Sequence, residues 1–355
     1  MAKRFVSVLI DTYNHERFIE QAITSVLEQE FPASDREIIV VDDGSTDRTP
    51  QIVRKFEPQV RLVRKQNGGQ ASAFNAGIPE CKGEIIAFLD GDDWWAPKKL
   101  SAVAEALATD GSLGLVGHGI TEVLSDGSQH SQLIKDIPRF RIDSETGALT
   151  FRLRKNFLGT SRMTYRTNLL ARIGKVPQAL TIQADEYLFT LGAVFSEVLI
   201  LRDSLTFYRL HESNAFQLSS GDTRAIRRKQ NVLEALAESV RKRFFDEKVS
   251  ERVTTTVVES IETEAELIRL SLDLGLPWET VRTELRNQRI MHPDTSVPRW
   301  LFKGLALLPA CVLPSRTYYW LRSGFSRNRI YRKARGKWLP ISQPKHVDDF
   351  HTTRT

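Results

Sequence analysis

The sequence predicts an α/β fold, with a mostly parallel sheet and helices between its strands, followed by an α-helical C-terminal region. Short apolar runs alternate with helical segments over the first half of the 355-residue chain, as in βαβ units. Several of these runs end abruptly in carboxylates, which predicts polar groups at the sheet edge where ligands bind. After about Gly221 the strand signal stops and Glu-, Arg- and Leu-rich helical patterns follow.

Four runs in the first half have the length and composition of buried parallel strands. These runs are Phe5–Ile10, Glu37–Val41, Val60–Val63 and Glu84–Leu89. Three helices are predicted between them: an apolar stripe over Ile19–Leu27, a helix opened by Pro50 and a helix that ends near Gly77. Leu113–Val123 and Val198–Leu205 are predicted as later strands.

The strand at Glu84–Leu89 is followed by the carboxylates Asp90, Asp92 and Asp93. Close carboxylates repel one another unless a cation compensates them. Mg²⁺ and Mn²⁺ prefer oxygen ligands and commonly share their shell with substrate phosphates. The residues alone leave a second interpretation open, an acidic turn that caps the helix after Pro97. Asp42 and Asp43 follow the second strand and could lie in the ligand crevice or simply cap the helix after Ser45.

Two further segments are informative but ambiguous by themselves. The small-residue loop Asn67–Ala73 can present backbone N–H groups to an anion or simply cap a helix. Asp185 and Glu186 stand at a predicted helix start, where the helix dipole alone favours acids. No GxGxxG follows the first strand, which argues against a dinucleotide-dependent enzyme.

The composition is that of an ordinary globular protein, with 41% apolar and 26% charged residues, and the length favours more than one module. The first residues show no secretory signal pattern, and no apolar stretch approaches the ~20 residues that span a bilayer. Cys81 and Cys311 match no metal or redox spacing, so a reducing cytoplasm is the expected compartment.

Six segments, in their order and spacing, resemble the family 2 glycosyltransferases, which have the GT-A fold. They are VSVLIDTYNHERFIEQAITSVLEQ (6–29), EIIVVDDGSTDRT (37–49), NGGQASAFNAGI (67–78), GEIIAFLDGDDWWAP (83–97), ADEYLFTLGA (184–193) and YRLHESN (208–214). The resemblance covers about residues 4–215. It implies a Rossmann-like GT-A catalytic domain, which we assign to residues 1–220, before a helical module at 221–294.

The implied activity is transfer of a sugar from a nucleotide-diphosphate donor to a hydroxyl acceptor, by metal-dependent single displacement with inversion. A UDP-sugar is the first expectation, with GDP and dTDP left open. The implied setting is surface-polysaccharide assembly on a saccharide or a lipid-linked acceptor. The sequence does not fix the sugar, the acceptor, the linkage or the oligomeric state.

The resemblance also implies a donor site. The nucleotide would be bound by residues of the first two strand ends, with Asp43 at the base ring: Thr12, Tyr13, Asn14, Asp42 and Asp43. The loop residues Asn67, Gly69 and Gln70 are expected beside the donor. Phe74–Asn75 stands where many relatives have Arg-Asn, so a phosphate contact is absent or comes from elsewhere.

The resemblance also implies which residues bind the metal and which residue is the general base. Asp90 and Asp92 match the DxD motif, with Asp92 as a ligand of Mn²⁺ or Mg²⁺ and Asp90 beside the ribose or the metal. His211 matches a histidine that reaches the metal or the diphosphate in some relatives. The family usually carries Glu-Asp where this chain has Asp185-Glu186, and the second acid is the general base. Glu186 inherits that role, and the reversed order leaves Asp185 as the alternative.

The C-terminal stretch is strongly basic. Between Thr295 and Val347 there is no Asp or Glu, and Lys and Arg alternate with apolar and aromatic residues. Segments of this composition typically bind to the surface of anionic membranes. We expect residues 295–355 to form a peripheral membrane-associating tail at the inner face of the plasma membrane. A basic cap on the catalytic domain is the alternative, and nucleic acid is not an expected partner because no recognition motif accompanies the charge.

Two other functions stay open at this point. A nucleotidyltransferase also uses acidic strand ends and Mg²⁺, but it needs a basic phosphate-binding signature near the first strand, which Asp11–Asn14 lacks. A non-catalytic nucleotide-sugar-binding scaffold is compatible with the reversed acidic pair at 185–186.

Overall fold

The computed structural model describes residues 5–132, 134, 139–211, 223–273, 275–291 and 307–326. The chain divides into two compact units. The first lies within Met1–Glu212 and includes Asp246–Val253, and the second comprises the remaining C-terminal helices. The domain boundaries predicted at 220 and 294 lie outside the described residues and remain predictions.

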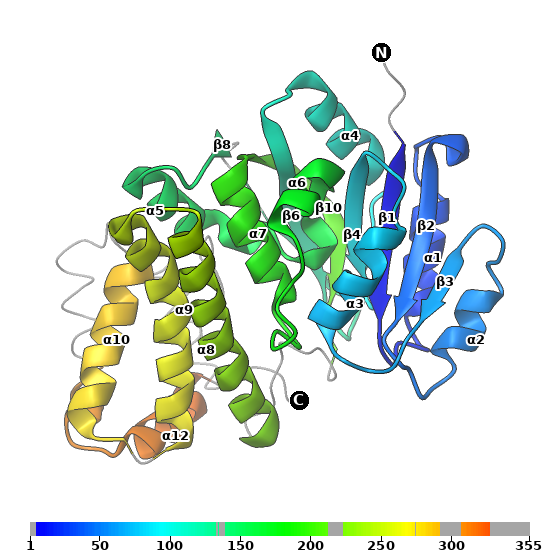
Figure 1. The fold of residues 1–355 in the computed structure, drawn as a ribbon. Helices are drawn as coiled ribbons and strands as arrows, with labels where there is room; N and C mark the ends of the chain where they lie inside the picture. Colours follow the sequence, from blue (N-terminus) through cyan, green and yellow to red (C-terminus); the bar gives the residue numbers. More distant parts are fainter. Residues whose placement is uncertain are drawn as a thin grey trace. The chain divides into compact units, whose positions relative to one another are not determined.

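The first unit is built around one ten-stranded sheet (Figure 1). Its strands are β1 (Val6–Thr12), β2 (Arg36–Asp42), β3 (Arg61–Arg64), β4 (Ile85–Asp90), β5 (Trp94–Trp95), β6 (Leu113–Val123), β7 (Gln129–Ser131), β8 (Arg139–Phe140), β9 (Thr164–Arg166) and β10 (Glu197–Arg209). Its α-helices are α1 (Ile19–Leu27), α2 (Thr49–Arg54), α3 (Gln70–Gly77), α4 (Lys99–Thr109), α5 (Glu145–Arg154), α6 (Thr167–Ile173) and α7 (Ala184–Phe195). Its 3₁₀ turns are η1 (Ala33–Asp35), η2 (Ile78–Glu80), η3 (Lys155–Phe157) and η4 (Thr160–Arg162).

The main strand order is β3-β2-β1-β4-β9-β6-β10-β5. The first four strands are mutually parallel, β9 is antiparallel to both of its neighbours, and β10 is parallel to β6. The predicted α/β fold is confirmed. The sheet is mixed because β5, β7, β8 and β9 are antiparallel additions of two or three residues, too short to produce a periodic sequence signal.

Helices cover both faces of the parallel strands (Figure 1). On one face, Val8 and Ile10 of β1 belong to the same buried core as Ile23 of α1 and Val103 of α4. On the other face α3 comes so close to the sheet that a Cβ on Gly77 would lie 2.5 Å from Cδ1 of Leu9. Because both faces are buried, polar groups of these strands are left to the strand ends.

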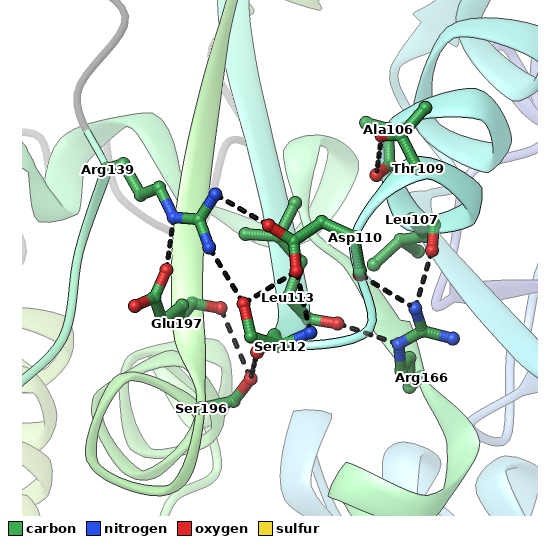
Figure 2. Close-up of polar contacts among 10 residues, drawn as sticks. All are labelled: Ala106, Leu107, Thr109, Asp110, Ser112, Leu113, Arg139, Arg166, Ser196 and Glu197. Atoms are coloured by element: carbon green, nitrogen blue, oxygen red, sulfur yellow. Dashed lines mark hydrogen bonds and ion pairs between the residues drawn. The ribbon is translucent and has the colours of Figure 1, made fainter.

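A polar cluster fixes the start of β6 and β10 (Figure 2). The Arg139 guanidinium lies 2.7 Å from an Asp110 carboxylate oxygen and 2.7 Å from Ser112 Oγ, and it also pairs with Glu197. Arg166 donates to the Leu113 carbonyl at 2.7 Å. Hydrogen bonds from Ser112, and then from Arg139, lower the pKa of Asp110 to about 2. These contacts stand at the amino ends of two long strands, opposite the carboxyl ends where ligands bind in such sheets.

The second unit is helical, as predicted. Its elements are α8 (Thr223–Asp246), α9 (Glu251–Leu272), α10 (Pro277–Met291), η5 (Leu308–Cys311) and α12 (Ser315–Ser326). Lys229 of α8 pairs with Glu264 of α9 at 2.8 Å. Tyr319 of α12 donates to Glu284 of α10 at 3.0 Å, next to a small apolar cluster. Among the helices that the structure describes, none has the length and apolarity to cross a membrane.

Candidate active site

Parallel pairing brings the acids at the strand ends to one edge of the sheet. Asp11 of β1 stands in register with Asp90 of β4 on one side and with Val41 of β2 on the other. Asp42 stands in register with Thr12. Residues in register on parallel neighbours point to the same face of the sheet, so Asp11 and Asp90 lie beside each other. The grouping that the sequence predicted for the ends of β2 and β4 therefore also includes the end of β1.

Asp43 is held at the amino end of α3. One carboxylate oxygen contacts Lys65 Nζ at 2.6 Å, and the other accepts from the Gly69 N–H at 2.7 Å. The Gly68 N–H lies 3.1 Å from both oxygens. Gly69 has φ +82°, and a Cβ there would lie 2.6 Å from the Thr181 carbonyl, so only glycine fits. The anion that the loop's N–H groups bind is thus a side chain of the protein, and it fixes Asp43 beside the predicted donor loop.

Asp42 and Asn14 connect the loops after β1 and β2. Asp42 is fully buried, accepts from the Ser45 N–H at 2.9 Å and pairs with Arg64 at 3.1 Å. Asn14 adopts φ +56°, donates its N–H to Ser45 Oγ at 2.8 Å and accepts from the Thr46 N–H at 2.8 Å. Both side chains therefore shape the loops that surround Asp43, and their predicted contacts with the nucleotide stay a prediction.

The other predicted donor residues differ in exposure. Thr12 is buried, whereas Tyr13 is 45% exposed and Asn67 is exposed. Gln70 donates to Thr160 Oγ1 at 3.0 Å and accepts from the Ala184 N–H at 2.8 Å. Gln70 therefore links the start of α3 to the start of α7, and Tyr13 is the predicted base-contacting side chain with the most open surface.

Asp92, predicted to belong to a DxD motif, contacts His211, the histidine that was predicted to reach the same metal. His211 Nε2 lies 3.0 Å from Asp92 Oδ2, and His15 Nε2 lies 3.8 Å from the same oxygen. Burial raises the pKa of Asp92, but the hydrogen bond from His211 and the proximity of His15 outweigh burial and leave it lowered. Asp92 is thus kept ionised at the strand edge, the state that a metal ligand needs.

The other two acids of the DxD segment share a partner in Ser161. Its hydroxyl lies 2.6 Å from Asp93 Oδ2 and 3.4 Å from Asp90 Oδ2, and it accepts from the Asp90 N–H at 3.1 Å. The Arg209 N–H donates to Asp93 at 3.0 Å. Burial, and then the charge of Asp92, raises the pKa of Asp93 to about 8; burial and Asp11 raise that of Asp90 well above its ordinary value.

Asp185 and Glu186 begin α7 and have different partners. Asp185 Oδ2 accepts from the N–H and the hydroxyl of Thr160 at 3.1 and 3.2 Å, and Oδ1 accepts from the Glu186 N–H at 2.9 Å. Glu186 Oε1 pairs with Lys155 Nζ at 2.5 Å. Burial, and then the charge of Glu186, raises the pKa of Asp185 to about 6. Each acid therefore has specific partners of its own, and a favourable helix dipole alone does not account for these contacts.

Asp11 shows how closely the acids converge. Burial raises its pKa to about 8, and the charges of Asp92, Asp185 and Asp43 add to the effect. One carboxylate is thus close enough to interact with acids from β2, β4 and α7. Asp11 was not among the site residues predicted from the sequence, although it too is an acid at the end of an apolar run, as Asp42 and Asp90 are. Lys155 and Ser161 carry no such local signal.

The described residues hold no group of three or more His, Cys, Asp or Glu side chains arranged to bind a metal ion. Asp92 and His211 do offer a carboxylate oxygen and an imidazole nitrogen 3.0 Å apart. A divalent cation of the Mg²⁺ or Mn²⁺ type is commonly held by one or two carboxylates and completes its shell with phosphate oxygens and water. The Asp92 carboxylate therefore fits such a cation, with the His211 imidazole beside it and Asp90 at the end of β4.

The strand order, the helices on both faces and the acids gathered at the carboxyl edge define the GT-A fold of the nucleotide-sugar-dependent glycosyltransferases. The sequence model of the family described as "Glycosyl transferase family 2" matches residues 7–172. Residues 7–172 therefore form a domain of glycosyl transferase family 2, which confirms the resemblance found in its motifs.

One curated glycosyltransferase illustrates how much of the chain its relatives match. An uncharacterized glycosyltransferase of Nostoc sp. is 33% identical over 216 residues, which cover 59% of this chain and 66% of that protein. The chain thus spans about two thirds of the length of this curated relative.

Two solved structures share the fold. The mannosyltransferase PcManGT of Pyrobaculum calidifontis, in complex with GDP-Man and Mn²⁺, superposes with a TM-score of 0.54 at 20% identity, over 95% of this chain and 88% of that one. Residues 1–349 of TarS of Staphylococcus aureus, in complex with UDP-GlcNAc, superpose with a TM-score of 0.51 at 22% identity, over 81% of this chain and 89% of that one.

Proposed function

We propose that the protein transfers a sugar from a nucleotide-diphosphate donor to a hydroxyl acceptor, with a divalent cation bound at Asp92. The observation that carries the proposal is that Asp43, Asp92 and Asp185 all lie near Asp11, with Glu186 next to Asp185. Membership of a glycosyltransferase family supports it. UDP is the first candidate nucleotide, and the fold-sharing neighbours, one with UDP-GlcNAc and one with GDP-Man, make GDP the second.

In this proposal the donor lies along the edge from β2 to β4. Tyr13 and Asp43 meet the nucleotide base, Thr12 and Asp90 lie by the ribose, and Asp92 with His211 holds Mn²⁺ or Mg²⁺. When bound, such a cation stabilises the negative charge that develops on the diphosphate as it leaves. The depressed pKa of Asp92 supports its role, because only the ionised carboxylate binds metal.

The acceptor side of the proposal assigns the base to Glu186. The acceptor hydroxyl oxygen bonds to the anomeric carbon as the bond from that carbon to the diphosphate oxygen breaks. Glu186 takes the hydroxyl proton, and the electron pair of the broken bond leaves with the diphosphate. Attack from the face opposite the diphosphate inverts the anomeric centre. Inversion is the family expectation, and it is a proposal for this chain.

A thermal-shift screen of nucleotide sugars tests donor binding. We expect a UDP-sugar to raise the midpoint of thermal unfolding in the presence of Mn²⁺, because a ligand of the folded state stabilises it by mass action. At a concentration of ~100 Kd the gain is about 2.7 kcal/mol. GDP- and dTDP-sugars form the comparison arms. A protein that no nucleotide sugar stabilises, with or without Mn²⁺, would contradict the proposal.

We also propose that the acceptor is lipid-linked and that the protein works at the cytoplasmic face of the plasma membrane. Support comes from the surface of the second unit. Leu308 of η5, Val312 directly after η5 and Trp320 of α12 are 60%, 76% and 72% exposed. A shallow apolar hollow of about 520 Å³ adjoins them, lined by Trp278, Val281, Arg282, Leu285 and Cys311. Of the basic residues of the predicted tail, the structure describes Arg316 and Arg322, and the others lie outside the described residues.

Liposome flotation tests this membrane proposal. Exposed apolar side chains insert below the headgroups of an anionic bilayer. The triple variant Leu308→Ser, Val312→Ser and Trp320→Ser is therefore expected to bind phosphatidylglycerol vesicles about 10-fold or more weakly than the parent. Phe245→Ser, which alters a side chain that is 83% exposed on α8, is the matched control and should bind like the parent. Equal flotation of all three proteins would remove the membrane proposal.

A further inference from the structure

One short segment, from Lys155 to Ser161, contacts both acidic groups of the site. At its start Lys155 Nζ pairs with Glu186 Oε1 at 2.5 Å. At its end the Thr160 N–H and hydroxyl bind Asp185, and the Ser161 hydroxyl lies 2.6 Å from Asp93. The segment therefore positions the acids of α7 relative to those that follow β4.

The Lys155–Glu186 pair is largely withdrawn from water. The two side chains are 14% and 10% exposed. A charge-assisted contact at such a site is stronger than one at the surface, and it restricts the rotamers of both side chains. The pair also joins residues 31 positions apart, so it is not a by-product of local helix geometry.

The two acids at the start of α7 differ in which oxygens remain available. Both oxygens of Asp185 accept hydrogen bonds, one from the Glu186 N–H and the other from Thr160. Glu186 uses Oε1 for Lys155, and within the described parts of the chain no donor engages its Oε2. Of the two acids, Glu186 thus has one carboxylate oxygen that accepts no hydrogen bond from the described residues, whereas each oxygen of Asp185 accepts at least one.

We propose that Lys155 is a positioning residue for the general base. By holding Oε1, Lys155 fixes the Glu186 carboxylate so that Oε2 is the atom that accepts the proton of the acceptor hydroxyl. The proposal rests on the proposed function, in which Glu186 is the base. It adds a residue that the sequence motifs do not contain, and it gives a geometric reason why Glu186, and not Asp185, has that role.

Two variants and one control test the inference. Lys155→Met removes the charged Nζ and keeps an unbranched side chain one atom shorter, and we expect kcat for sugar transfer to fall about 10- to 100-fold because a misplaced catalytic group loses effective molarity. The donor KM should stay within about threefold, since Lys155 acts on the base and not on the nucleotide. Lys155→Arg restores a cation and should recover most of kcat. Lys55→Met, an exposed lysine after α2, should match the parent.

A double-mutant cycle separates a positioning role from a general loss of structure. If Lys155 acts through Glu186, then Lys155→Met adds no further loss in a Glu186→Gln background. Full additivity, no arginine rescue, or a Lys155→Met variant equal to Lys55→Met would each overturn the inference. Failure of the proposed function has a different signature, because the parent protein would then show no transfer from any nucleotide sugar.

Discussion

Asp92→Ala is expected to lower kcat/KM for sugar transfer by about 10²–10⁴-fold, because a cation that neutralises a leaving diphosphate supplies several kcal/mol. Asp92 Oδ2 lies 3.0 Å from His211 and 3.8 Å from His15, so its removal takes the central oxygen from the predicted cation site. The measurement is the initial rate of nucleotide diphosphate release at saturating acceptor, titrated with Mn²⁺. The variant should show a weaker dependence on Mn²⁺ as well as a lower rate.

Two companion variants make the result specific. Asp92→Asn keeps the shape of the side chain and removes its charge, and it should lose nearly as much rate as the alanine variant. Asp203→Ala, at an exposed carboxylate in β10, should leave the rate unchanged. The unfolding midpoints of all three must be compared, since Asp92 is a half-buried partner of His211. Parent-like Mn²⁺ dependence and rate in Asp92→Asn would contradict the assignment of Asp92 as metal ligand.

The sequence predicted the elements in which a periodic signal is strong. The four parallel strands and the helices between them follow directly from apolar runs and stripes that are long enough to have a period. The two-residue strand at Trp94–Trp95 and the strand at Thr164–Arg166 were not predicted as such. Their pairing depends on β10, β4 and β6 being in place, which is a tertiary effect that no local window contains.

Some residues of the candidate site could likewise be predicted from the sequence, and others could not. The acids at strand ends could be predicted, because the carboxyl ends of parallel strands meet at one edge of the sheet. The contact between Asp92 and His211 agrees with the family pattern. The side chains that contact these acids could not be predicted from the sequence. Ser161 lies 68 positions from Asp93, and Lys155 lies 31 from Glu186, so only the fold brings them together. Asp42, by contrast, is used inside the protein, where its two oxygens hold a loop and Arg64.

Glu186→Gln is expected to lower kcat by about 10²–10⁴-fold, the usual contribution of a positioned general base. The amide keeps the shape of the side chain but cannot take a proton, so the donor KM should change little. Asp185→Asn is the informative comparison, because Asp185 already accepts three hydrogen bonds and is expected to act by supporting the loop at Thr160. Glu105→Gln, at an exposed position on α4, is the control.

The pH dependence of the rate tells the two acids apart. The pKa of Asp185 is raised to about 6, first by burial and then by Glu186. A base works only when it is deprotonated, so a reaction that used Asp185 would slow as the pH fell through about 6. If Asp185→Asn abolished transfer while Glu186→Gln kept a parent-like rate with that acid limb, Asp185 would be the base. The opposite pattern, in which transfer is lost in Glu186→Gln and only weakened in Asp185→Asn, is the one that the unengaged oxygen of Glu186 predicts.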